Sequence, residues 1–312
     1  MVRVILRLAG ENLAVFFLAT FLIFWIINQA PGDPIDIWHP EPGMSAADRQ
    51  AIAQELGLQR PLVERYARLL WRTVRLDLGA FDGVPISERL LHGIGVTLLL
   101  ALSASAVSVA VGVPLGVLGG LERGGPPIRV ATMIVYVASL LPVFLLCYLV
   151  HLFFLNTVGV LPTPQSVENR ATIWKVLTAL SMASVLGIGD GTATEILRYV
   201  RSEVRRISNS QFIRAARVNG GSVTRHLARN TLVPIATIIN LRMLYFLGGA
   251  VVVEAIFQLD GLGWLTWQSI DSRNYELLFA VSVVSVIAVC AVNLLNNVTI
   301  GLIDPRVRAR SG

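Results

Sequence analysis

The sequence predicts an all-α membrane protein with six transmembrane helices and a small helical insertion on the external face after the first of them. The 312-residue chain is 54% hydrophobic, and only 15% of its residues are charged. An ordinary soluble domain carries about a quarter of its residues as charged side chains. The apolar residues also collect in blocks of about twenty, separated by charged stretches, as in α-helical membrane proteins. These observations exclude a soluble single domain and a disordered chain.

The first apolar block lies close to the N-terminus. It runs from Leu13 to Ile27, and with its flanks from Leu8 to Asn28 it gives about 30 Å of helix, enough to cross a bilayer. A secretory signal peptide is excluded because its apolar run would be shorter and because no small-x-small cleavage site precedes Pro31. Five further spans are expected at Ile94–Gly120, Ile128–Leu155, Ile173–Leu197, Leu232–Phe257 and Leu277–Ile303.

Arginines near the span ends set the expected orientation. With the N-terminus in the cytoplasm, the cytoplasmic segments hold 15 of the 26 basic residues and the exterior segments hold ten. Seven of those ten lie in one long loop where acidic residues outnumber them. Both termini are therefore expected in the cytoplasm. The net charge of +6 is then a result of topology and requires no nucleic-acid partner.

The first exterior loop, from Ala30 to about Gly93, is too long for a simple connector. It contains a helix start at Ser45, an amphipathic run that ends at Gly57, and a second run from Pro61 to Leu76. We expect a small helical cap on the external face. Two roles stay open for it: a surface or lid used in transport, or a purely structural cover.

The segment between the fourth and fifth spans carries the most specific pattern, RAARVNGG at residues 214–221. Small side chains there let another surface approach the backbone closely, and Gly220 can end a short helix. A second short helix then leads to Pro234, which lies in the first turn of a span, where its missing N–H costs nothing. We expect a helix, turn, helix element that either docks into a cytosolic protein or binds anionic lipid headgroups.

The Ala-Ala-x-x-x-Gly spacing followed by Leu-x-Pro resembles the EAA motif of ATP-binding-cassette (ABC) importer permeases. Arg214 stands where that motif often has Glu or another polar residue. Further segments are similar, in the family's order, to the B subunit of dipeptide and oligopeptide permeases. They are Pro31-Gly32-Asp33-Pro34, Glu55-Leu56-Gly57-Leu58 with Pro61-Leu62, Leu76-Asp77-Leu78-Gly79, Gly248–Glu254 running to Gly261-Leu262-Gly263, and Asp304-Pro305-Arg306.

This resemblance implies a type I ABC importer permease of the MetI-like fold in a bacterial plasma (inner) membrane. It implies that the chain imports dipeptides or oligopeptides with a second homologous permease, two cytosolic ATPases and an extracytoplasmic solute-binding protein. It also implies that ATPase coupling falls to a set of residues in the fourth-to-fifth segment: Arg214, Ala215, Ala216, Arg217, Gly220, Arg225 and Pro234.

The expected organisation has four parts. Residues 1–30 form the first transmembrane helix, 31–93 the extracytoplasmic cap, 94–303 the five-helix permease core, and 304–312 a cytoplasmic tail. The coupling loop occupies 198–233 within the core.

The chain is not expected to be an enzyme. A P-loop needs a lysine before Ser or Thr in a glycine-rich turn, whereas the one lysine, Lys175, follows Ile173-Trp174. ATP and its magnesium ion would therefore be bound by partner subunits, with no cofactor in this chain. The four histidines have no metal-ligand spacing.

Of the ionisable residues within the expected spans, three are candidates for the pathway or its gate: Asp190, Arg242 and Glu254. Asp190, flanked by glycines, would line the pathway and attract a substrate ammonium group, or have a structural role. Arg242 lies at a depth from which its side chain can reach the cytoplasmic headgroups. Glu254 lies near the outer end of the same span, where we expect a gate or a contact with the binding protein. Asn293 and Asn297 share one helix face and suit interhelical hydrogen bonds.

Two other functional classes remain as alternatives. An ion-coupled secondary transporter would use Asp190 and Arg242, although such carriers often show paired repeats and none is visible. A membrane scaffold would move no solute. Within the resemblance, nickel chelates and glutathione are alternative substrates.

Overall fold

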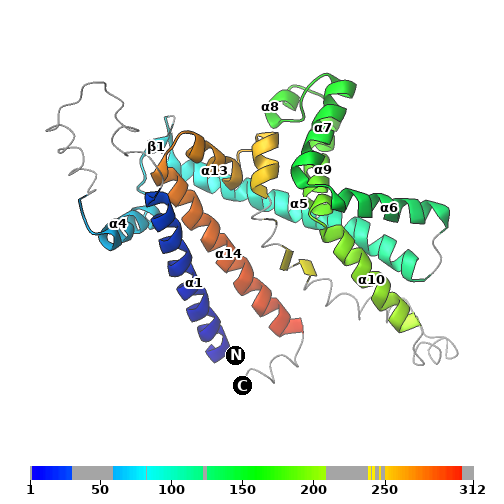
Figure 1. Cartoon of the computed structure of the whole chain (residues 1–312), viewed down its shortest axis with the longest axis horizontal. Helices are drawn as coiled ribbons and strands as arrows, with labels where there is room; N and C mark the ends of the chain where they lie inside the picture. The colour runs from blue at the N-terminus through cyan, green and yellow to red at the C-terminus, as the bar shows by residue number, and fades with distance from the viewer. Residues whose placement is uncertain are drawn as a thin grey trace.

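The structure is a computed structural model (Figure 1). It describes residues 2–29, 59–81, 83–121, 125–208, 238–239, 241–242, 246 and 250–303, with side chains from residue 10 of the first helix and up to residue 295 of the last. The elements within these residues are α1 (Val2–Asn28), α4 (Leu62–Val74), β1 (Ala80–Phe81), β2 (Val84–Pro85), α5 (Ile86–Gly120), α6 (Pro126–Leu140), α7 (Val143–Val158), α8 (Pro164–Val167), α9 (Thr172–Gly189), α10 (Thr192–Ser208), α13 (Leu262–Asp271) and α14 (Tyr275–Ile303).

The first and last long helices, α1 and α14, lie side by side (Figure 1). Their contact includes the Nδ2 group of Asn293, which donates to Asn12 Oδ1 at 3.0 Å across the two helices. This confirms the expected interhelical hydrogen bond for Asn293, while the side chain of Asn297 lies outside the described residues. Within a bilayer such a bond holds two helices together because lipid offers no competing partner.

Part of the loop expected on the external face folds as the amphipathic helix α4 and packs on these two spans. Tyr66 is buried among Phe24 and Phe279, with ring centroids 5.7 Å and 6.2 Å away. Its hydroxyl forms a 2.8 Å hydrogen bond with Thr20 of α1. The run expected from Pro61 is therefore a helix, attached to α1 and α14. The earlier run, up to Gly57, lies outside the described residues.

The longest described helix is α5, and it packs along α9 and α10. A row of small residues spaced by four makes this approach possible: Ala104, Ser108, Gly112, Gly116 and Gly120. A Cβ on Gly112 would lie 2.7 Å from the Ala193 carbonyl oxygen, and one on Gly116 would lie 2.8 Å from Val200 Cβ. Only glycine allows the helices to come this close, as in other closely packed membrane helices.

The span expected over Ile128–Leu155 is instead two helices, α6 and α7, that meet at 115°. The break lies at Leu141 and Pro142, where Leu141 is extended with ψ 138°. Proline has no N–H to continue the helix and disfavours the helical conformation of the residue before it. The bend therefore follows from Pro142.

The span expected over Ile173–Leu197 also divides, into α9 and α10. Asp190 ends α9, and Gly191 adopts a φ of 84°, a conformation that glycine tolerates without strain. Helix α10 then continues to Ser208, so the first part of the expected coupling loop is helical. Residues 209–237 lie outside the described part of the chain.

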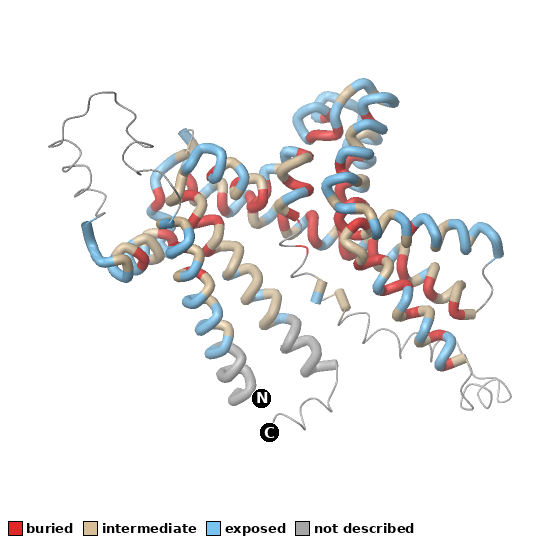
Figure 2. The backbone as a smooth tube through the Cα atoms, in the orientation of Figure 1, coloured by how far each residue is buried: buried red, intermediate tan, exposed pale blue. Residues whose placement is uncertain are grey.

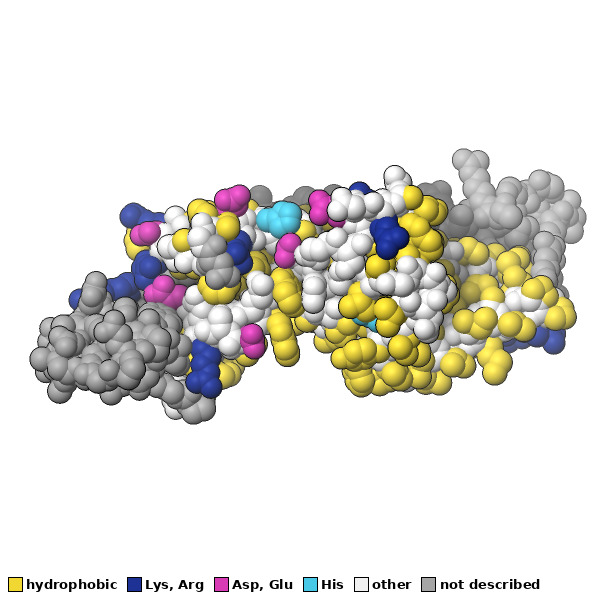
Figure 3. All heavy atoms as spheres, turned by 90° about the horizontal axis from the view of Figure 1, so that it is seen from above, with side chains coloured by type: hydrophobic (Ala, Val, Ile, Leu, Met, Phe, Trp, Pro, Cys, Tyr) yellow, Lys and Arg dark blue, Asp and Glu magenta, His cyan; other side chains and the backbone are white. Residues whose placement is uncertain are grey.

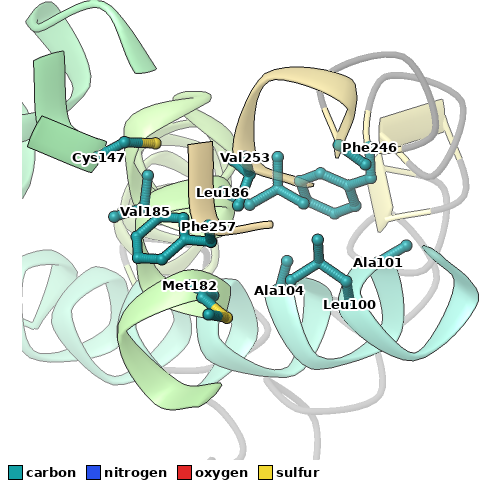
Figure 4. Close-up of a cluster of buried hydrophobic side chains, with 11 residues drawn as sticks. Leu100, Ala101, Ala104, Cys147, Met182, Val185, Leu186, Phe246, Val253 and Phe257 are labelled. Atoms are coloured by element: carbon teal, nitrogen blue, oxygen red, sulfur yellow. The ribbon is translucent and has the colours of Figure 1, made fainter. Parts of the chain in front are cut away.

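The central core joins α5, α7 and α9 to Phe246 and residues 250–257. The cluster includes Leu100, Leu186, Phe246 and Phe257, with Cys147 buried at its edge (Figure 4). Figure 2 shows the same pattern, since buried positions concentrate where α5, α9 and α10 meet. Both cysteines are free thiols, as expected from their apolar surroundings.

Four described helices are long and apolar enough to cross a bilayer, and the bent α6–α7 pair makes a fifth. Much of the span expected at Leu232–Phe257 falls in residues that are not described. Large apolar side chains are exposed along α1, α6, α7 and α9. Figure 3 shows hydrophobic side chains gathered over the half of the molecule that contains α6 and α7. The protein is thus a multi-pass helical membrane protein.

Candidate functional site: the junction of α9 and α10

The predicted ATPase-coupling residues Arg214, Ala215, Ala216, Arg217, Gly220, Arg225 and Pro234 lie outside the described residues. The described element that leads into them is α10. Its arrangement on α5, and the ion pairs at its N-terminal end, define the candidate site.

Helix α10 has one buried face and one charged face. The buried face is formed by Ile196, Val200, Val204 and Ile207, of which the first three are completely buried against the valines of α5. Their spacing of about 3.6 residues is that of an amphipathic helix. The other side of α10 carries Arg198, Arg201, Arg205 and Arg206. The helix is therefore fixed to α5 along its length.

Arg242, from the segment after the expected coupling loop, binds two carboxylates at the junction of α9 and α10. Its Nη2 lies 2.5 Å from Glu195 Oε2, its Nε donates to the same oxygen at 2.6 Å, and its Nη1 lies 3.7 Å from Asp190 Oδ2. Both N–H groups share one oxygen of Glu195, and charge-assisted hydrogen bonds of this kind are stronger than neutral ones. Arg242 thus ties the fifth span to the junction of α9 and α10.

The Asp190 carboxylate also accepts a hydrogen bond from a nearby residue of its own segment. Thr192 Oγ1 donates to Asp190 Oδ2 at 2.8 Å, and the Asp190 side chain keeps 20% of its surface exposed. A substrate ammonium at this carboxylate would compete with Arg242. Lining of the pathway by Asp190 stays a prediction, and the ion pair gives it a structural role too.

The structure brings Asp190 and Arg242 together, and adds Glu195, which the sequence reasoning missed. The sequence does contain a signal for Glu195. It is a carboxylate five residues after Asp190, near the start of an amphipathic helix, and the expected fifth span contains one basic residue, Arg242, that needs a partner. The positive charge of Arg242 is compensated by the carboxylates of Glu195 and Asp190, so its side chain does not require lipid headgroups as partners.

Glu254 lies at a separate place and is completely buried. Its Oε1 accepts a hydrogen bond from Thr97 Oγ1 at 2.7 Å, and its Oε2 accepts from the backbone N–H groups of Gly263 at 2.6 Å and Trp264 at 3.2 Å. Thr97 Oγ1 in turn accepts from the N–H of Leu262 at 2.9 Å. The first N–H groups of α13 are thereby satisfied by a carboxylate and a hydroxyl.

Two glycines make room for the Glu254 carboxylate. A Cβ on Gly261 or Gly263 would collide with its oxygen Oε2. The Glu254 and Gly261-Leu262-Gly263 segments noted in the sequence therefore form one unit, which attaches α13 to α5 and to residues 250–257. Because the carboxylate is buried, it is not on a surface that a binding protein can touch in this structure.

The helical membrane fold described above is similar to that of a protein of known structure. Inward-facing MetNI, a methionine ABC transporter, aligns with a TM-score of 0.53 and 18% identity, over 70% of this chain and 98% of that chain. At this identity the match shows the fold: the protein has a MetI-like helical membrane fold.

The family follows from sequence. Residues 112–309 match the family model described as the binding-protein-dependent transport system inner membrane component, and the chain belongs to this family. The oligopeptide transport system permease protein AppB of Bacillus subtilis is 30% identical over 98% of this chain and 99% of its own. The dipeptide transport system permease protein DppB of Escherichia coli is 27% identical over 99% of both chains.

Proposed function

We propose that the chain is a transmembrane permease subunit of an ATP-driven importer of dipeptides or oligopeptides and forms half of the translocation pathway. The observation that carries this proposal is the nearly full-length similarity to AppB and DppB, whose names specify oligopeptide and dipeptide transport. The MetI-like fold supports it.

The proposed assembly contains a second homologous permease, two cytosolic ATPases and an extracytoplasmic solute-binding protein. This chain has no P-loop lysine and does not itself hydrolyse ATP; the partners bind ATP and magnesium. It crosses the membrane six times with both termini in the cytoplasm. Residues 31–93 form the external cap.

Transport proceeds by alternating access in this proposal. ATP-driven closure of the ATPases moves the loop 198–233, and the two permeases then change which side is open. Ligands shift such an equilibrium only through their different affinities for the two states. Helix α10 is suited to carry the movement because its apolar face is fixed to α5 and its N-terminal end is tied to Arg242.

The coupling assignment is tested with Gly220→Trp in the assembled transporter. A bulky side chain at this position should prevent docking, so peptide uptake falls while ATP hydrolysis continues and membrane insertion is normal. The matched control is Gly10→Trp in α1, where an added Cβ meets no atom within 4 Å. Normal uptake by Gly220→Trp would show that the loop does not couple.

A further inference from the structure

A pocket of about 550 Å³ lies where the C-terminal end of α5, the first turns of α6 and the middle of α10 meet. It is separate from both the Arg242 ion pairs and the Glu254 anchor. Arg129, Arg201 and Arg205 line it, together with Thr132 and Tyr136. In the proposed topology this end of the helices faces the cytoplasm.

The arginines come from two helices that face each other. Arg129, Thr132 and Tyr136 are spaced by three and four residues and share one face of α6, and Arg201 and Arg205 are one turn apart on α10. Helices α6 and α10 are in contact. A Cβ on Gly119 would lie 3.5 Å from Cδ and Nε of Arg201, so the stem of Arg201 lies along bare backbone of α5.

Two of the three arginines that line this pocket are left without an ion pair within the described part of the chain. Arg129 and Arg201 have no carboxylate partner among the described residues. The nearby carboxylate of Glu203 is already bound by Arg206, whose Nε donates to it at 3.0 Å. Guanidinium groups of this kind match the geometry of a phosphate group and bind it through paired N–H groups.

An apolar strip begins at the same pocket. Met133 lines the pocket, is 65% exposed, and belongs to a face of α6 on which all the large apolar side chains are about half exposed or more: Val130, Met133, Ile134, Val137 and Leu140. A free phosphate ion would make no contact with such an apolar strip. The acyl chains of a phospholipid can pack along it while the phosphate group lies in the pocket.

We infer that this pocket binds the phosphate headgroup of an anionic phospholipid, with its acyl chains on the exposed face of α6. The headgroup sits between Arg129 of α6 and Arg201 of α10 and holds the two helices together at the end of α5. Each arginine near a lipid phosphate contributes about fivefold to affinity.

The experiment measures lipid binding to the purified complex in detergent by native mass spectrometry, with phosphatidylglycerol and phosphatidylcholine as probes. The wild type should prefer phosphatidylglycerol, and Arg129→Gln with Arg201→Gln should reduce that preference by about 25-fold. The control is Arg198→Gln, which removes one positive charge from α10 outside the pocket; it should keep the preference within about twofold, against about a fivefold loss for Arg129→Gln alone.

The inference would be overturned by an unchanged preference in the pocket variant or by an equal loss in the control. Displacement of the lipid by an equal concentration of inorganic phosphate would also overturn it. So would a pocket variant that loses the ATPase subunits while its lipid binding stays intact. The last would assign the pocket to a protein contact. If the double variant is not recovered, the exposed Arg129→Gln alone should give about a fivefold loss. Lipid binding requires no transport, so its failure leaves the proposed function untouched.

Discussion

At the scale of single residues, the polar groups of the membrane-embedded helices are used as ties between segments distant in the sequence. Arg242 joins the segment after the proposed coupling loop to Glu195 and Asp190 before it. Glu254 joins residues 250–257 to α13 and, through Thr97, to α5. Charged groups are costly at membrane depth unless they are paired in this way.

The Arg242 pair is tested by a double-mutant cycle on thermal stability. Arg242→Gln and Glu195→Gln should each lower stability, and the double variant should lose less than the sum, giving a coupling of about 1 kcal/mol for this partly exposed pair. The measurement is the unfolding midpoint of the detergent-solubilised complex. Additive losses would mean that the two side chains do not interact.

Loss of the Glu254 carboxylate should have a larger effect. Glu254→Ala leaves the N–H groups of Gly263 and Trp264 without an acceptor in a buried site, which costs on the order of 3 kcal/mol. Glu276→Ala on α14 is the control, because its ion pair with Arg72 is partly exposed and is worth about 1 kcal/mol or less. Equal shifts of the unfolding midpoint in the two variants would contradict the anchor.

At the scale of helices, the number and approximate position of most spans could be predicted from the apolar blocks, but their shapes could not. Pro142 accounts for the break between α6 and α7, but hydrophobic periodicity does not give the 115° angle or its direction, because these depend on what the two helices pack against. The small residues of α5 are visible in the sequence at four-residue spacing, yet their partner α10 is set by the tertiary fold.

The candidate site was predictable in the same partial way. Asp190 and Arg242 were identified because ionisable groups are rare in apolar blocks. Their pairing was not, because 52 residues separate them and nothing local specifies the contact. Glu195 was missed since it looks like an ordinary charge on a solvated helix face.

Close packing of α5 on α10 predicts a contrast between two glycines of the same helix. Gly116→Ala places a Cβ against Val200 and should destabilise the protein by about 1 to 3 kcal/mol. In Gly95→Ala the added Cβ meets no atom within 4 Å, and alanine has a higher helix propensity than glycine, so the free energy of unfolding should be equal or slightly higher. The unfolding midpoints of the two variants test this, and equal values would show that α5 and α10 are not closely packed.

At the scale of the whole molecule, the described helices leave large apolar faces uncovered on α1, α6, α7 and α9. Lipid and a second permease subunit would cover them in the proposed assembly. The family membership of residues 112–309 and the nearly full-length similarity to peptide permeases place the chain in a transport system whose energy, in this account, comes from other subunits.

The most direct test of this account is peptide uptake into proteoliposomes that contain the chain with its partner permease, ATPases and binding protein. We predict uptake of labelled dipeptide that requires hydrolysable ATP on the ATPase side and continues when a protonophore removes the proton gradient. Uptake that continues without ATP and stops with the protonophore would contradict the account and favour an ion-coupled carrier using Asp190 and Arg242.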